Sequence, residues 1–127
     1  MNKSQLSDST PGAKLDAGKP DMSLLQLFGD ALYEVAKVGT FGAEKYSRGG
    51  FLLVPNGPTR YSAAMLRHYF LELIEGTFDK DPYYDTPAGQ KWKDKIRHDA
   101  QVAWNALARL QTQLNEEKSR ERSTDEG

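Results

Sequence analysis

The sequence predicts an all-α fold, a bundle of three main helices joined by long loops. Three stretches, 23–46, 60–76 and 90–115, carry apolar residues at the spacing of one helix face. The segments between them, 47–59 and 77–89, are punctuated by Gly, Pro and other turn-forming residues. The chain has 127 residues, of which 38% are hydrophobic, so it can build only a modest core. We therefore expect oligomerisation to complete the burial.

The bulk composition excludes several classes of protein. The 17 basic and 18 acidic residues leave a net charge of −1, which gives no field that would favour nucleic acid or an anionic membrane. There is no cysteine, so a disulfide framework and a thiolate zinc site are both excluded. No apolar run approaches the length of a signal peptide core or a membrane span. We expect a cytoplasmic protein.

The N-terminal 22 residues are rich in Ser, Asp, Gly, Pro and Lys. Such a composition cannot bury enough apolar surface to order itself. We expect a flexible arm over 1–22 and a helical catalytic domain over 23–115. Within the arm, the stretch K-L-D-A-G-K-P is either a solvated tail or a segment that folds over an anionic ligand. In the second case its ligand-binding residues are Lys14, Asp16 and Lys19.

The first main helix is expected over 23–46, with Asp30 as an N-cap after Gly29. Its core-facing residues are expected to be Leu32, Val35, Ala36, Gly39, Ala43 and Tyr46. Gly39 and Gly42 are expected to let a neighbouring helix come close. Glu34 and Lys45 lie on the opposite face, where solvated residues are commoner than site residues. We keep Glu34 as a candidate metal ligand and Lys45 as a candidate substrate contact.

The second main helix, Arg60–Gly76, is the centre of the functional hypothesis. It carries the pattern E-x-x-E at Glu72 and Glu75 within a largely apolar helix. Buried carboxylates are costly unless they are paired, protonated or bound to a metal. The helix therefore predicts a metal site.

The third main helix, Gln90–Asn115, is expected to be the longest. Its predicted core stripe is Trp92, Ile96, Asp99, Ala103, Leu107, Leu110 and Leu114. Asp99 occupies a core slot in this stripe, so it needs a partner or an ion. His98 and Asn105 lie on a second face and could line a cleft, although His98 could equally be a hydrogen-bonded core histidine. The charged residues 116–127 predict a disordered C-terminal tail.

The acids of the second and third helices can converge on one point. Glu72, Glu75 and Asp99 come from consecutive helices whose connecting loop permits antiparallel packing. Ligands that offer only oxygen favour Mg²⁺ or Mn²⁺, which bind through carboxylates and substrate phosphates. We therefore assign the catalytic role in a phosphate reaction to these acids. The available cationic contacts for phosphate are Lys14, Lys19, Lys45, Arg60 and Arg67.

The chain resembles the MazG-like all-α nucleoside triphosphate pyrophosphohydrolases. The resemblance rests on E-L-I-E, which ends at Glu75, and on I-R-H-D, which ends at Asp99; twenty residues separate the two motifs. The family has E-x-x-D in the second motif, so Ile96 stands where the family has its third acid. Either another acid, such as Glu34 or a loop aspartate, completes the site, or fewer protein groups hold the metal.

A more specific resemblance covers about residues 12–110. The segments K-L-D-A-G-K-P, A-L-Y-E-V-A-K-V, F-G-A-E-K-Y-S-R-G-G, R-Y-S-A-A-M-L-R-H and H-D-A-Q-V-A-W-N-A-L occur in this order. They are similar to the small phage dATP/dGTP diphosphohydrolases, which include the MazZ type. The resemblance implies a homodimer or homotetramer, Mg²⁺ or Mn²⁺, and cleavage of dGTP or dATP to the monophosphate and pyrophosphate. It also implies a role in phage nucleotide metabolism in the host cytoplasm, where dGMP would feed 2-aminoadenine synthesis.

Two alternatives stay open. His98 and Asp99 form an H-D pair with His68 upstream, as in an HD-type dNTP triphosphohydrolase, which releases tripolyphosphate. That family needs a further downstream aspartate on a folded element, and Asp125 in the expected tail is the only one. The other alternative is a non-enzymatic helical interaction protein whose acids pair with Arg67 or Lys45. The full set of candidate substrate contacts is Lys14, Asp16, Lys19, Lys45, Arg60, Arg67, His68, His98 and Asn105.

Overall fold

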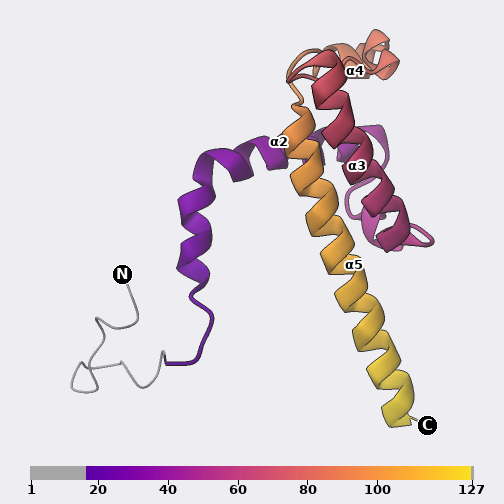
Figure 1. The fold of residues 1–127 in the computed structure, drawn as a ribbon. Helices are drawn as coiled ribbons and strands as arrows, with labels where there is room; N and C mark the ends of the chain where they lie inside the picture. The colour runs from indigo at the N-terminus through magenta and orange to yellow at the C-terminus, as the bar shows by residue number, and fades with distance from the viewer. Residues whose placement is uncertain (1–16, 127) are drawn as a thin grey trace.

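Three helices dominate the computed structural model, which describes residues 17–126 (Figure 1). They are α2 (Gly29–Lys45), α3 (Gly57–Glu75) and α5 (His98–Glu126). Short helical segments occupy the connections: η2 (Met22–Phe28), η3 (Gly50–Leu53), η4 (Pro82–Asp85) and α4 (Pro87–Gln90). Within residues 17–126 there is no strand, and an isolated bridge joins Phe78 to Arg97. The prediction of an all-α fold with three main helices is confirmed.

α3 and α5 pack side by side and form the body of the molecule (Figure 1). Gly57, the first residue of α3, lies against Thr112, since a Cβ added to it would be 3.5 Å from that side chain. Further along α3, His68 contacts His98, the first residue of α5. The two helices are therefore antiparallel, as the loop between them led us to expect.

α2 approaches α5 at Gly39. A Cβ added to Gly39 would lie 2.6 Å from a ring carbon of Trp104, which is closer than real side chains allow. Only glycine can hold this helix so near the indole ring. The prediction of a close approach is confirmed at Gly39. It is wrong at Gly42, where an added Cβ would meet nothing within 4 Å.

The predicted helix Arg60–Gly76 is present and begins slightly earlier than expected. Asn56 has a left-handed backbone with φ 55°, and Pro58 lies in the first turn, where its missing N–H costs nothing. The helix ends at Gly76, whose φ of 93° suits glycine and whose N–H bonds to the Glu72 carbonyl. These local signals explain why this helix was the best predicted of the three.

The start of α2 differs from the prediction. Asp30 is not an N-cap but lies inside the first turn, where its negative charge favours the positive end of the helix. The cap forms earlier, where Asp21 accepts a hydrogen bond from the backbone of Ser23 at the start of η2. Of the expected core stripe, Val35 is buried, whereas Leu32 and Tyr46 are exposed. The stripe fails because η2 and the first turns of α2 extend away from α5 (Figure 1).

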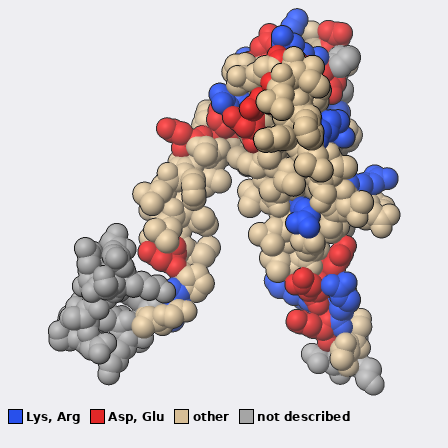
Figure 2. All heavy atoms as spheres, in the orientation of Figure 1, with Lys and Arg blue, Asp and Glu red and all other residues tan. Residues whose placement is uncertain are grey.

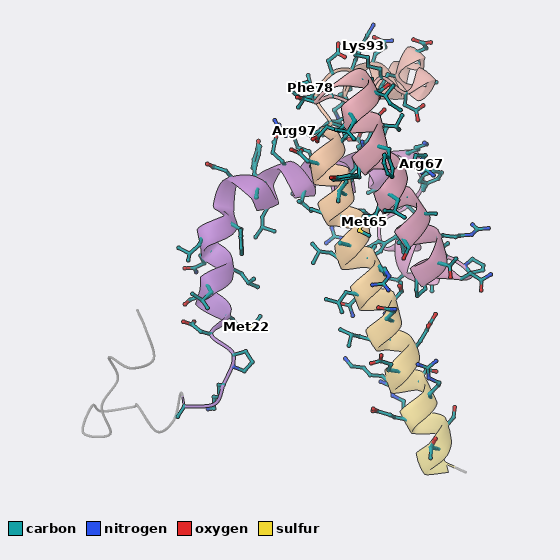
Figure 3. All side chains as sticks on the ribbon, viewed as in Figure 1. Met22, Met65, Arg67, Phe78, Lys93 and Arg97 are labelled. Atoms are coloured by element: carbon teal, nitrogen blue, oxygen red, sulfur yellow. The ribbon has the colours of Figure 1, made fainter. Side chains whose placement is uncertain are left out.

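α5 begins at His98, not at Gln90 as predicted. Backbone hydrogen bonds join Asp79 N–H to Ile96 O and His98 N–H to Thr77 O, both 2.9 Å long. These bonds hold the segment before His98 against residues 77–79, so its amide groups cannot join a helix. Figure 3 shows Phe78 and Arg97 next to each other at this junction. Shortly before Arg97, Asp94 has a left-handed backbone with φ 57°, which is not a helical conformation.

The expected disordered tail is helical in the structure. α5 continues to Glu126, so residues 116–126 extend the helix beyond the body of the molecule (Figure 1). Its Glu, Lys and Arg residues are good helix formers, and their propensity explains why the charged composition did not end the helix. The arm predicted over 1–22 lies mostly outside the described residues.

The predicted core stripe of the third helix is wrong for its leucines and for Asp99, whereas Ile96 is buried as predicted. The leucines of that stripe, Leu107, Leu110 and Leu114, are exposed, and the Asp99 side chain is 51% exposed. The buried residues of α5 are instead His98, Ala100, Asn105, Ala108 and Thr112. The inward face of α5 thus carries polar and small side chains. The prediction also counted residues 91–97 as part of this helix, although they are not helical.

Large apolar side chains remain exposed on two further surfaces. One is η2, where Met22, Leu24, Leu25, Leu27 and Phe28 all face solvent. The other lies on α3 and comprises Leu66, Tyr69, Phe70, Leu73 and Ile74. Figure 2 shows largely uncharged surface over η2 and the middle of the body, and Figure 3 shows Met22 far from α3 and α5. Among the described helices, none combines the length and apolarity needed to cross a bilayer.

Ile96, at the position of the missing third acid, is a core residue with 1% exposure. We expect Ile96→Ala to destabilise the fold by about 2–5 kcal/mol, because it leaves a cavity under the junction of α3 and α5. Urea denaturation followed by circular dichroism measures this change. The exposed Leu53→Ala serves as the control and should change the free energy of unfolding by less than about 0.5 kcal/mol. Equal effects of both substitutions would contradict the assignment of Ile96 to the core.

Candidate functional site

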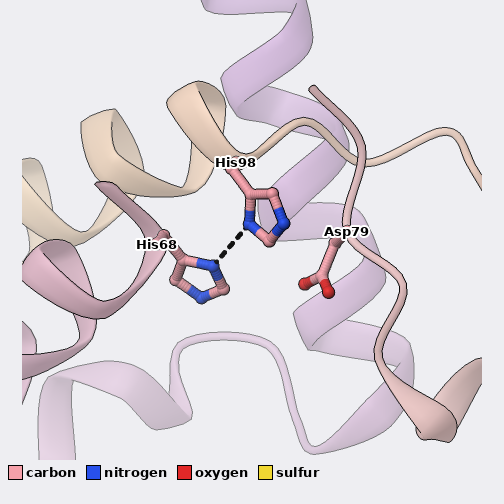
Figure 4. A group of neighbouring side chains, drawn as sticks. All are labelled: His68, Asp79 and His98. Carbon is pink, nitrogen blue, oxygen red and sulfur yellow. Dashed lines mark hydrogen bonds between the residues drawn. The ribbon is translucent and has the colours of Figure 1, made fainter. Parts of the chain in front are cut away.

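Two histidines and an aspartate meet at the junction of α3, α5 and the loop between them (Figure 4). His68 comes from α3, His98 opens α5, and Asp79 comes from the loop. One ligand atom from each lies within 4.8 Å of the others. His98 is 0% exposed, Asp79 6% and His68 9%. These residues, called the His/Asp group below, could hold a metal ion.

The loop places Asp79 beside His98 through the backbone. The same two hydrogen bonds that delay the start of α5 run between residues 77–79 and 96–98. They align the two segments so that Asp79 and His98 face the same point (Figure 4). The side chain of Ile96, whose carbonyl accepts one of these two bonds, is buried in the core.

Glu75 orients His98. Its Oε1 lies 2.5 Å from His98 Nε2, and His98 Nδ1 lies 3.0 Å from His68 Nδ1. A carboxylate can only accept, which assigns a proton to Nε2 and leaves Nδ1 of a neutral His98 with its lone pair toward the His/Asp group. A ring that donates one N–H to a carboxylate and offers the other nitrogen is the usual form of a metal-ligating histidine.

The charge states suit such a site. Burial raises the pKa of Glu75, but hydrogen bonds from His98 and from the Lys80 backbone outweigh burial and lower it overall. Burial lowers the pKa of His68, and the nearby charge of Asp79 only partly opposes this. His68 is therefore neutral around neutral pH, which is the form that binds a metal.

Asp79 is also held in place. Its Oδ2 accepts a hydrogen bond of 2.9 Å from Gln101 Nε2, and its Oδ1 accepts one of 2.9 Å from Asp81 N–H. Gln101 lies on α5, one turn beyond His98. Each member of the His/Asp group thus has a neighbour that fixes it, so the donor set is preorganised. Two imidazoles and one carboxylate suit a divalent transition metal better than Mg²⁺, which prefers oxygen ligands alone.

A cleft opens beside the His/Asp group. It has a volume of about 1130 Å³ and lies between α2, the following loop and α5. Gln101 lines the cleft and also donates to Asp79, so the cleft and the His/Asp group share one wall. A molecule in the cleft would therefore contact Gln101, which is one hydrogen bond away from Asp79.

Comparison with known proteins decides the family. Residues 9–122 match the family model described as dATP/dGTP diphosphohydrolase, N-terminal. The chain belongs to this family. No curated protein and no solved structure gave a match.

Membership in the dATP/dGTP diphosphohydrolase family makes the chain a pyrophosphohydrolase that acts on deoxynucleoside triphosphates. The sequence-based prediction of the family and of an enzyme is confirmed. The non-enzymatic alternative is excluded. The His/Asp group and the adjoining cleft are the parts of the described structure that fit a metal-dependent reaction on a phosphoanhydride.

The acids predicted to bind metal fall into two places. Glu75 lies against His98, as described above. Asp99 instead pairs with Arg97 through bonds of 2.8 and 2.9 Å, which lower the pKa of Asp99. The same bonds raise the pKa of Arg97, and the charges of Glu34 and Glu72 add to that effect. Glu34 pairs with Lys37 at 2.7 Å, so Glu34 and Asp99 each have a basic partner outside the His/Asp group.

The core slot predicted for Asp99 is wrong, because its side chain faces solvent and Arg97 is the partner it needs. The buried acid is Asp79, which the sequence analysis treated only as one of several loop aspartates. The chain has two histidines, and the structure shows both of them buried and in contact with each other. The buried acid beside them, Asp79, is therefore the third member of the group.

The predicted substrate contacts are also divided. Lys45, Arg60 and Asn105 line the cleft, whereas His68 and His98 belong to the His/Asp group. Lys19 and Arg67 are exposed outside the cleft lining, and Figure 3 shows Arg67 on α3. Lys14 and Asp16 lie outside the described residues.

The paired substitutions Asp79→Asn and Asp99→Asn separate the two groups of acids. We expect Asp79→Asn to weaken Mn²⁺ binding at least about 10- to 100-fold, because it removes a buried ligand charge. Asp99→Asn should change Mn²⁺ affinity far less, since Asp99 is occupied by Arg97. Isothermal titration with Mn²⁺ alone measures both. A loss confined to Asp99→Asn would instead place the metal among Glu34, Glu72 and Asp99.

Proposed function

We propose that the protein hydrolyses dGTP or dATP to the monophosphate and pyrophosphate, with a divalent metal held by His68, Asp79 and His98. The observation that carries the proposal is the buried His/Asp group at the wall of a nucleotide-sized cleft. Family membership supports the choice of deoxynucleoside triphosphates as substrates.

Mn²⁺ is the cofactor that we favour over Mg²⁺. Mn²⁺ accepts imidazole nitrogen more readily, and the His/Asp group offers two such nitrogens beside one carboxylate. When bound, the metal would neutralise the negative charge of the triphosphate oxygens.

The chain's own residues position these parts. Glu75 keeps the proton of His98 on Nε2, so Nδ1 carries the lone pair, which faces His68 Nδ1 in this structure. Gln101 holds Asp79 and, as a cleft residue, also contacts the space that the substrate would occupy. Arg60 and Lys45 add positive charge along the cleft, where they can bind phosphate oxygens.

Glu34, Glu72 and Asp99 form a second candidate cation site in this proposal. They are the acids that the MazG-like resemblance assigns to metal and catalysis, together with Glu75. In the structure Arg97 supplies the positive charge among them. A metal could bind there only if Arg97 left Asp99, so these three acids would act after a rearrangement of that pair.

The cellular role follows from the product. We place the enzyme in the cytoplasm, where the deoxynucleotide pool is, and in the host cytoplasm if a phage encodes it. Conversion of dGTP to dGMP would then supply a precursor for 2-aminoadenine synthesis in phage nucleotide metabolism.

A panel of nucleoside triphosphates with product analysis tests the reaction. With Mn²⁺ we expect dGTP and dATP to give monophosphate and pyrophosphate, and pyrimidine deoxynucleotides to react at least about tenfold more slowly, since one poorly fitted base costs more than about 1.4 kcal/mol. Anion-exchange chromatography separates the products.

The same assay distinguishes the HD-type alternative. His68 and His98 both belong to the His/Asp group, but Asp99 turns away to Arg97, so the H-D pair does not act as a unit. Release of tripolyphosphate and a nucleoside would select the triphosphohydrolase and refute our proposal. Asp79→Asn is the matched negative control for any activity that depends on the His/Asp group.

We also infer that the working enzyme is a homodimer or homotetramer. The apolar surfaces on η2, on α3 and on the leucine face of α5 are too extensive for a chain of this size to leave in water. Residues at helical spacing on α3, such as Phe70 and Leu73, form a continuous surface suited to helix packing.

Light scattering at micromolar concentration tests the assembly. We expect a mass of two or four times 14.2 kDa for the unaltered protein. The double substitution Phe70→Glu and Leu73→Glu should shift the mass toward the monomer, because it places charges in the packed surface. Lys118→Glu, on the exposed end of α5, is the control and should leave the mass unchanged. A monomeric mass for the unaltered protein would contradict the inference.

A further inference from the structure

The cleft contains an aromatic ring fixed on two sides. The benzo edge of Trp104 rests on the backbone of α2 at Gly39, where no side chain could fit. The ring of Phe51 stands edge-on to Trp104, with 5.0 Å between centroids and an interplanar angle of 63°. Trp104 is only half-buried and lines the cleft. An aromatic ring held in this way offers a flat, preorganised surface for a planar ligand.

Asn105, which directly follows Trp104 in the sequence, adds polar atoms to the cleft wall. Asn105 is 8% exposed, and one of its amide N–H groups donates to the Gln101 carbonyl over 2.7 Å. Within the described part of the chain, no hydrogen bond reaches its Oδ1, and the indole N–H of Trp104 has no partner either. An amide that offers both a donor and an acceptor matches the edge of a purine.

The charge of the cleft lining has one sign. Lys45, Arg48 and Arg60 line the cleft, and no Asp or Glu does. In the described residues, no carboxylate forms an ion pair with Arg48 or Arg60. On the face drawn in Figure 2, basic and acidic residues lie together at the top of the body and at the end of α5, whereas the lining of the cleft has basic residues alone. A wholly apolar occupant, such as η2 of a second copy, would bury Arg48 and Arg60 without an acidic partner.

We propose that this cleft is the nucleotide pocket, in which Trp104 stacks on the purine base, Asn105 contacts the base edge, and Arg48 with Arg60 attracts the phosphates. The inference rests on the proposed function for the identity of the nucleotide. It adds that nucleotide binding is separable from metal binding, because none of these four residues belongs to the His/Asp group.

The two tryptophans of the chain make the pocket directly observable. Trp92 lies outside the cleft lining, with its indole N–H bonded to Glu44 at 2.7 Å and its ring near Phe41. In Trp92→Phe protein, Trp104 is the sole reporter. We expect dGMP and dGTP to quench its fluorescence saturably in EDTA, with excitation at the red edge where purines do not absorb. Trp104→Phe protein, which reports from Trp92, should show no such quenching.

Kinetics give the second readout. Trp104→Leu keeps an apolar side chain but removes the stacking surface, so we expect KM for dGTP to rise about 5- to 100-fold while kcat changes little. Trp92→Phe should leave KM within about twofold of the unaltered value. Far-UV circular dichroism checks that each variant is folded.

Arg48→Gln tests the pocket at an exposed position where misfolding is not a concern. We expect it to weaken dGTP binding in EDTA about tenfold and to reduce the dependence of binding on salt, since it removes one phosphate contact. Arg120→Gln, an equal change of charge on the far end of α5, is the matched control and should have no effect.

The outcomes separate this inference from the proposed function. Quenching by dGTP without turnover of any triphosphate would refute the proposed reaction and leave the pocket in place. Turnover with an unchanged KM in Trp104→Leu, or no quenching in Trp92→Phe protein, would overturn the pocket and leave the reaction in place. Equal weakening by Arg48→Gln and Arg120→Gln would also overturn it.

Discussion

His68 and His98 bury their imidazole rings against each other where α3, α5 and the loop between them meet. Such polar rings can be buried only if their nitrogens find partners. His98 has one on each side, with His68 at Nδ1 and Glu75 at Nε2. This contact fixes the relative position of α3 and α5, and it requires the loop to return so that Asp79 faces both rings. The geometry of the His/Asp group and the start of α5 both follow from it.

The distribution of polarity on α5 is a consequence of the same contact. The face toward α3 carries His98, Asn105 and Thr112, and the leucines point outward. Asn105 and Thr112 each donate to a carbonyl one turn back in their own helix, which gives each buried side chain a partner. A helix with a polar inner face and an apolar outer face is stable in water only if something covers the outer face. The site and the need for assembly thus have a common origin.

Gln101 couples the two halves of the site. Its side chain holds Asp79 and its backbone carbonyl accepts from Asn105, so one residue of α5 touches both the metal-binding side chains and the wall of the cleft. Glycine at position 39 is equally important on the opposite wall, because it lets α2 approach Trp104 closely enough to shape the cleft. His98 of the His/Asp group and the base-contacting residues Trp104 and Asn105 therefore lie on neighbouring turns of a single helix, which favours precise positioning.

The sequence by itself determined the all-α class, the presence and C-terminal end of α3, and the family. Apolar spacing and the Gly76 end are local signals, and the ordered motifs are read without knowledge of contacts. It also pointed to Glu75, His68 and His98. Tertiary structure decided that Asp79 joins the two histidines, that Asp99 turns to Arg97, and that the leucines of α5 face outward. The reason is that two backbone hydrogen bonds between residues 77–79 and 96–98 set where α5 begins and bring Asp79 beside His98. No pattern within a single helix encodes a constraint that comes from another segment.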